Sequence, residues 1–199
     1  MIAIFVSLFS GFLCGFLHLF PASFSWYLDG MVDGALLVLV FGVGMELASS
    51  DEAFQEAKKM GFKILLLPLV AMGGSLLGAL GVAVFSSLGV TESLSVASGF
   101  GWYSLSGVLL ARLGNPSLGL LAFMANVLRE IITLFGVGWV YRVLGGWAAV
   151  ALGGATSMDT TLGLLSRISG GRLVPLGVTS GVVHSLFVPL CIALFSRFL

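Results

Sequence analysis

Four ionisable residues lie within or at the edge of long apolar stretches of this sequence. Arg129 and Glu130 lie near the centre of one stretch, Asp159 follows a run of hydroxyl residues, and Glu46 ends another stretch. A charge at the centre of a bilayer costs at least about 2.5–3.5 kcal/mol on insertion scales, so each group needs a partner or a path to water. The carboxylates could hold a cation, and Arg129 could hold a carboxylate. Asn126 lies three and four residues before the pair, on their shared helical face.

Each of these residues also has a structural interpretation. Arg129 could bind a carboxylate of the protein or the carbonyl groups of a broken helix. Glu130 and Asp159 could form buried ion pairs, and Glu46 could extend to the membrane interface. His184, in an apolar helix, is expected to be a hydrogen-bonded packing residue, although a proton-carrying role is physically open to it. The sequence leaves these alternatives open.

Two glycine- and hydroxyl-rich stretches interrupt the apolar sequence at 98–107 and 153–161. Irregular backbone inside a membrane survives only where protein buries it or where it lines a wet cavity. A pair of such segments indicates the binding site of a transporter, so we expect 99–106 and 155–160 to face each other around one cavity near mid-membrane. The candidate substrate-binding residues are Gly99, Gly101, Trp102, Tyr103, Ser104, Ser106, Asn126, Arg129, Glu130, Thr156, Ser157 and Asp159, and the candidates for ion coupling are Glu46, Glu130 and Asp159.

The composition predicts that membrane helices position these residues. The chain is 58% hydrophobic and 9% charged, whereas soluble domains contain about 25% charged residues. Since a helix needs about 20 apolar residues to cross the hydrocarbon core, we expect an all-α integral membrane protein with a single transport domain over 1–199. About five full spans are predicted at 2–20, 31–47, 63–88, 116–141 and 173–198, with broken or re-entrant segments at about 94–110 and 147–165.

The charges of the loops orient part of this chain. Lysines cluster around the connection at 49–59, which we interpret as a short cytoplasmic interfacial helix. The N-terminus is then cytoplasmic, and both topologies that we considered place the C-terminus outside. If both broken segments cross the membrane, Arg112 lies inside and Arg142 outside; if both are re-entrant, the two exchange sides. The positive-inside rule favours neither topology.

Several classes of function have no sequence support. No pattern of catalytic residues, metal ligands or phosphate-binding glycines is present, so we expect no enzyme, no metal site and no cofactor. The balance of nine basic and nine acidic residues gives no reason to expect a nucleic-acid partner. Cys14 and Cys191 lie in apolar segments and are interpreted as small hydrophobic residues. An intramembrane hydrolase would need Ser104 or Ser157 beside His184, and no sequence feature places them together.

Two motifs carry a resemblance to a known family. The stretch 97–107, ASGFGWYSLSG, resembles the hallmark of the LysO-type bacterial lysine exporters, and so does 154–162, GATSMDTTL. The Arg129-Glu130 pair and the stretch 185–189 also match that pattern. Typical members carry additional N-terminal spans that this sequence does not contain, and they have Asn-Asp where this chain has Ala125-Asn126. One family acid is therefore absent, which leaves the substrate and the coupling ion open.

The resemblance implies an exporter of L-lysine or its analogues in a bacterial or archaeal inner membrane, coupled to protons or another cation. Glu130, Asp159 and Glu46 could hold the two ammonium groups, and Arg129 or helix N-termini could hold the carboxylate. A passive channel, or the membrane subunit of a two-chain transporter, is the alternative. We also expect the chain to act as a homodimer, through Gly-x-x-x-Gly faces of its early helices, or with a separately encoded short membrane partner.

Overall fold

A computed structural model describes residues 63–113 and 115–199, together with isolated positions between 6 and 45. The chain divides into two compact units, Met1–Glu46 and Leu47–Leu199. The predicted spans at 2–20 and 31–47 lie largely outside the described residues, and the charged connection at 49–59 and Glu46 lie entirely outside them. Most of the isolated positions in the first unit are helical. The site described below belongs to the second unit.

Three long apolar helices of the second unit match three predicted spans. They are α4 (Lys63–Phe85), α7 (Pro116–Leu144) and α10 (Val174–Ser196), and among the described residues these are the helices long and apolar enough to cross a membrane. Helix α7 begins where Asn115 Oδ1 accepts a hydrogen bond from the Leu118 N–H at 3.0 Å, with Pro116 in its first turn. Outward-facing residues such as Phe85 and Phe135 are 92% and 87% exposed, as lipid-facing side chains should be.

The segments between these spans are broken, as predicted. The first consists of α5 (Val90–Ala97) and α6 (Tyr103–Arg112), separated by the irregular residues 98–102. The second consists of α8 (Gly146–Gly153), the short 3-10 helix η2 (Gly154–Met158) and α9 (Leu162–Ser169). We call them the first and second hairpin, and we call residues 98–102 and 154–161 their tips. Every element in the described part of the chain is helical.

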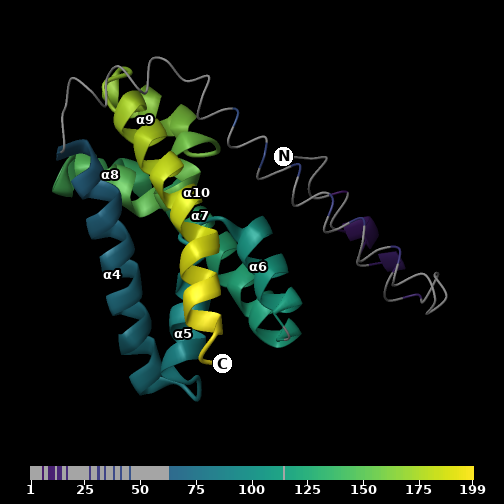
Figure 1. Ribbon diagram of the computed structural model, residues 1–199. Coiled ribbons are helices and arrows are strands. Elements are labelled where there is room, and N and C mark those ends of the chain that lie inside the picture. The colour runs from purple at the N-terminus through teal and green to yellow at the C-terminus, as the bar shows by residue number, and fades with distance from the viewer. Residues whose placement is uncertain are drawn as a thin grey trace. The chain divides into compact units, whose positions relative to one another are not determined.

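Each hairpin returns to the end of the bundle from which it enters (Figure 1). Helices α4 and α7 are antiparallel, since Ile64 near the beginning of α4 clusters with Val137 near the end of α7. Helix α6 packs antiparallel to the first half of α7, where Gly107 lies against Gly119. The first hairpin therefore begins and ends beside the Phe85 end of α4. The second begins and ends at the opposite end, between the end of α7 and the beginning of α10.

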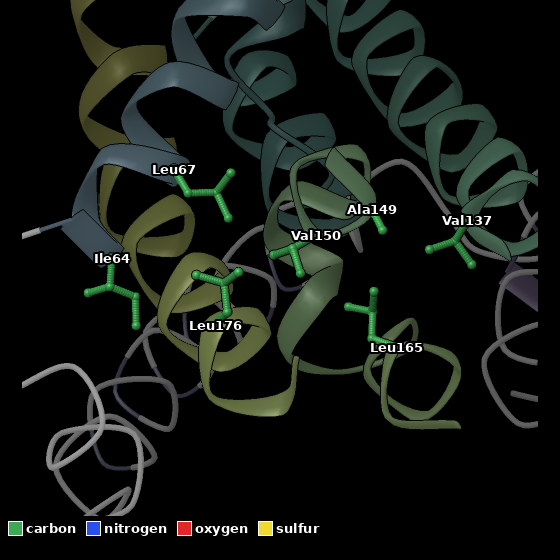
Figure 2. Packing of buried hydrophobic residues seen from close by; sticks show 7 residues of the cluster. All are labelled: Ile64, Leu67, Val137, Ala149, Val150, Leu165 and Leu176. Carbon is green, nitrogen blue, oxygen red and sulfur yellow. The ribbon is translucent and has the colours of Figure 1, made fainter. Parts of the chain in front are cut away.

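A buried apolar cluster fixes the second hairpin among the long helices (Figure 2). It joins residues of α4, α7, α8, α9 and α10, all 7% exposed or less. Because it draws on both arms of the hairpin and on all three spans, it holds the hairpin against all three long helices. The members of the cluster are Ile64, Leu67, Val137, Ala149, Val150, Leu165 and Leu176.

Candidate functional site

The two hairpin tips meet inside the bundle. The backbone N–H of Ala155 donates a hydrogen bond to the Phe100 carbonyl oxygen at 2.9 Å. A Cβ atom on Gly154, whose φ is +61°, would lie 2.3 Å from that oxygen, and one on Gly101, whose φ is +103°, would lie 2.9 Å from the Gly153 oxygen. A side chain at either glycine would force the tips apart. The prediction that these segments face each other is confirmed.

Asn126 of α7 holds the first tip. Its Oδ1 accepts a hydrogen bond from the Gly101 N–H at 2.7 Å. Its Nδ2 donates to the Ala122 carbonyl at 2.8 Å and to Ser106 Oγ at 3.3 Å. Gly99 completes the contact, because a Cβ there would lie 2.2 Å from Asn126 Nδ2. The buried amide is therefore occupied by the protein itself on both its donor and acceptor sides.

Arg129, three residues further along α7, holds the second tip. Its Nε donates to the Leu152 carbonyl at 3.1 Å, and its Nη2 donates to the Ala151 carbonyl at 3.2 Å. Its Nη1 donates to Ser75 Oγ on α4 at 3.2 Å. These carbonyls belong to the last turn of α8, where the helix supplies no N–H partners. The guanidinium thus binds the carbonyl groups of a broken helix, which is one of the structural interpretations given above for Arg129.

A cavity of about 80 Å³ lies where the tips meet. The first hairpin contributes its tip and the beginning of α6, the second contributes η2 and the residues after it, and α10 contributes one serine. Six of the predicted site residues line this cavity. Four further residues were not among the candidates. The lining consists of the named candidates Gly101, Trp102, Tyr103, Ser104, Thr156 and Asp159, of Ala155, Met158 and Thr160, which lie in the expected segment 155–160, and of Ser185.

Asp159 supplies the carboxylate among the residues lining the cavity. It follows η2, it is exposed, and it accepts hydrogen bonds from the Thr160 backbone N–H and, at 3.1 Å, from the Thr160 hydroxyl. Both donors belong to the neighbouring residue, so the carboxylate keeps a free side toward the cavity. A carboxylate placed in this way can accept hydrogen bonds from an ammonium group.

Glu130 of α7 is a second acid of this unit, and it is buried. It is 7% exposed, and its Oε1 has no hydrogen-bond partner among the described residues. Glu130 does not itself line the cavity. Since buried polar atoms are nearly always hydrogen-bonded, the free oxygen of Glu130 identifies a place where a ligand can donate.

The remaining predicted residues support the tips and do not line the cavity. Ser157 Oγ donates to the Val150 carbonyl at 2.8 Å within the second hairpin. Ser106, Gly99, Asn126 and Arg129 form the contacts given above. Thr160 and Ser185 were not named as candidates, although Thr160 lies in the expected segment 155–160 and Ser185 begins the stretch 185–189 that matches the family pattern. Glu46 lies outside the described residues, so its role stays a prediction.

Comparisons with known proteins give a consistent match. The model of a family described as "Lysine exporter LysO" matches residues 5–196. The chain is 37% identical over 161 residues to the lysine exporter LysO of Escherichia coli K12, which covers 81% of this chain and 53% of that protein. It is 32% identical over 199 residues to a putative lysine exporter of Haemophilus influenzae, with 98% of this chain and 96% of that protein covered. The chain thus spans about half the length of the first relative. No solved structure matches significantly.

Proposed function

We propose that this chain, which belongs to the lysine exporter LysO family, exports L-lysine or a related cationic amino acid across a bacterial cytoplasmic membrane and uses a cation gradient to drive export. One observation carries the proposal. Asp159 and the N-terminal end of α6 share a cavity where two opposed hairpins meet. The Asp159 carboxylate attracts a positive charge and the N-terminal end of α6 attracts a negative one, as the ammonium and carboxylate groups of an amino acid require. The activity of an exporter family is transport and not catalysis.

The substrate carboxylate would lie at the beginning of α6. Trp102, Tyr103 and Ser104 line the cavity there, and the first N–H groups of a helix have no partner within it. Arg129 is not needed for this contact, because its donors are directed to α8 and Ser75. The position is a helix-terminus anion site of the kind that discontinuous helices provide in transporters.

The two ammonium groups of lysine need two negative partners. Asp159 would bind one of them inside the cavity, and the partnerless oxygen of Glu130 would receive the other. The aromatic faces of Trp102 and Tyr103 would add cation–π attraction, worth about 0.5–2 kcal/mol. These acids also remain the candidates for binding the coupling cation, together with Glu46. Competition between substrate and cation for the same carboxylates would link their movements in opposite directions.

The cavity is small for a whole amino acid in this arrangement. Pockets that enclose small ligands measure about 300–1,000 Å³, whereas this one measures about 80 Å³. The tips must therefore separate to admit the substrate. The hydrogen bond from the Ala155 N–H to the Phe100 carbonyl is the contact that this opening would break first.

The arginines favour one orientation of the second unit. Arg142, Arg167 and Arg172 lie at the end of the bundle where α4 begins, and Arg112 and Arg197 lie at the opposite end. The positive-inside rule then places the first end in the cytoplasm. The second hairpin would open toward the cytoplasm and the first toward the outside, so that the joined tips separate the two sides.

A second copy of the chain is the proposed partner. The α4 glycines Gly74, Gly78 and Gly81 share one face, and a Cβ on any of them would meet nothing within 4 Å. Such a face allows close helix contact in a membrane. A homodimer would cover it, and a separately encoded short membrane protein is the other arrangement. Mass measurement of the purified chain in mild detergent distinguishes a dimer, a two-protein complex and a monomer.

Flux in proteoliposomes tests the transport proposal. The purified chain should catalyse saturable lysine counterflow, and Asp159→Asn and Glu130→Gln should each reduce it at least about tenfold, since an acceptor charge for an ammonium group is lost. Glu92→Gln is the matched control, because Glu92 binds the Gly89 N–H at the beginning of α5, away from the cavity. Wild-type counterflow in Asp159→Asn would refute the assignment, and non-saturable flux without counterflow would indicate a passive channel.

A further inference from the structure

His184 of α10 is buried against the residue that joins the hairpin tips. Its side chain is 0% exposed, and its ring makes an edge contact with the Phe100 ring, with the centroids 5.9 Å apart and the planes at 68°. The Phe100 carbonyl accepts the hydrogen bond from Ala155 that links the two hairpins. The φ of Phe100 is +45°, a strained value for a residue with a side chain. The imidazole therefore packs on the contact that must change when the cavity opens.

The hydrogen bond on one side of the ring fixes the state of the other side. His184 Nδ1 lies 2.7 Å from the Ser180 carbonyl oxygen, which can only accept, so Nδ1 carries the hydrogen. In the neutral ring, Nε2 then has a lone pair that can accept a proton. Nε2 is buried and has no hydrogen-bond partner among the described residues. A buried acceptor without a partner is rare in folded proteins and calls for an explanation.

Two further polar atoms on α10 are also buried without a partner among the described residues. Ser185 lines the cavity, and its Oγ has no partner within the described part of the chain. The hydroxyl oxygen of Thr179 on the same helix is also buried without one. Helix α10 thus carries three buried polar atoms without partners among the described residues, at Thr179, His184 and Ser185, which do not share one face of the helix. A protein hydroxyl or water there can pass a proton between the cavity and Nε2.

The charges around His184 come mainly from α7 and the tips. Arg129 is the charged side chain that acts electrostatically on the ring. Of the elements packed against α10, α8 and η2 contain no charged residue, and the charges of α4, α5, α6 and α9 lie near helix ends. Toward the middle of the bundle the titratable groups besides Arg129 are Glu130, Tyr103 and Asp159; those near helix ends are Lys63, Glu92, Arg112 and Arg167, and α10 itself carries Cys191.

We propose that Nε2 of His184 is a proton-binding site of this transporter. Burial opposes a charge on the ring while the tips are joined. When they separate, water reaches Nε2, which takes a proton from hydronium to form an N–H bond and releases it on the other side of the membrane. The imidazolium adjoins Ser185 in the cavity wall, so it repels a cationic substrate. Proton and substrate would then occupy the site in turn, which is antiport. This inference rests on the proposed function.

Proton release on substrate binding tests the site in the purified full chain. Adding lysine to weakly buffered wild-type protein between about pH 5 and 7 should release protons that an indicator dye detects. His184→Gln, which keeps a polar side chain but cannot ionise, should lose at least about nine-tenths of that release. The chain has two histidines, so His18→Gln is the matched control and should release protons as the wild type does. Equal release from His184→Gln and wild type would overturn the proposal.

Flux supplies the second measurement. The ratio of pH-gradient-driven lysine flux to lysine–lysine exchange should fall at least about tenfold in His184→Gln, since exchange requires no net proton movement. An unchanged ratio would overturn the proton site. If His184→Gln does not fold, ¹⁵N spectra of histidine-labelled wild type decide: Nε2 of His184 should change from lone-pair to N–H character on acidification, and a constant signal would refute the site. Absence of any lysine flux by the wild type would refute the proposed function, whereas ring titration would still support proton binding.

Discussion

The two hairpins present opposite hydrogen-bonding groups to α7, a donor from the first and acceptors from the second, and a different α7 side chain binds each. The first tip offers the Gly101 N–H, which the Asn126 side-chain oxygen accepts. The second hairpin offers the carbonyls of Ala151 and Leu152, to which Arg129 donates. The second contact follows from helix polarity, since the end of a helix leaves carbonyls unpaired, whereas the Gly101 N–H belongs to the irregular tip just before α6. Two residues three positions apart therefore secure both tips.

This comparison explains how the ionisable residues divide between structure and function. The cation at the centre of α7 is directed to the carbonyls of α8, whereas Asp159 faces the cavity and Glu130 keeps an unpaired oxygen. Asp159 is thus the charged residue that lines the cavity, although the whole chain has no net charge. An intramembrane arginine next to a glutamate is thus not by itself a substrate ligand.

The largest expected effect comes from separating the tips directly. Gly154→Ala places a Cβ against the Phe100 carbonyl and requires a left-handed conformation, so it should destabilise the protein by about 3–5 kcal/mol. Thermal unfolding in detergent measures the loss. Gly163→Ala in α9 is the matched control, because a Cβ there meets nothing within 4 Å. Equal stability of the two variants would show that the tips do not need to meet.

Removal of the donor for the second hairpin ranks next. Arg129→Met leaves the Ala151 carbonyl and Ser75 without this donor and leaves the Leu152 carbonyl with only the Thr133 hydroxyl at 3.3 Å, which should cost about 3 kcal/mol of unfolding free energy. Arg129→Lys should recover only part of this, since an ammonium group cannot reach three acceptors in a plane. Arg142→Met at the exposed end of α7 serves as the control. Full stability of Arg129→Met would contradict the assigned role.

Removal of the acceptor for the first hairpin should cost less. Asn126→Leu leaves the Gly101 N–H unpaired and buried, at an expected cost of about 2 kcal/mol. Its neighbour Ala125 is exposed, so Ala125→Leu should change stability little. Denaturant unfolding of both variants measures the difference. If Asn126→Leu is as stable as Ala125→Leu, the first tip is held by other contacts.

The smallest effects distinguish the internal bonds of the two hairpins. Ser157→Ala removes a 2.8 Å hydrogen bond to the Val150 carbonyl and should cost about 1 kcal/mol. Ser106→Ala removes longer contacts, 3.3 Å from Asn126 Nδ2 and 3.4 Å to the Tyr103 carbonyl, and should cost less than about 0.5 kcal/mol. Midpoints of thermal unfolding for both alanine variants provide the test. The reverse order would mean that the first hairpin depends more on its own hydroxyls than the second.

Much of the candidate site could be predicted from residue type alone. Glycine and hydroxyl residues inside apolar segments identified both tips, and length and hydropathy identified α4, α7 and α10. Which polar residues bind the backbone and which line the cavity could not be predicted. Asn126 and Asp159 were both polar candidates, yet one binds backbone and the other lines the cavity. Ser185 begins the stretch 185–189 that matches the family pattern, but it was not named as a candidate because the sequence does not indicate which neighbour it meets.

The sequence by itself determined an all-helical membrane protein with two broken segments and a small set of polar residues that must be buried. That much follows from local chemistry, since apolar length predicts a span and glycine with hydroxyl residues interrupts one. The tertiary structure decided that both segments return to the end from which they enter. Loop charges could not decide it, because exchanging Arg112 and Arg142 leaves their count unchanged on each side. The decisive groups are backbone N–H and carbonyl groups at the helix ends, which every residue other than proline carries and whose partners are set only when distant segments meet.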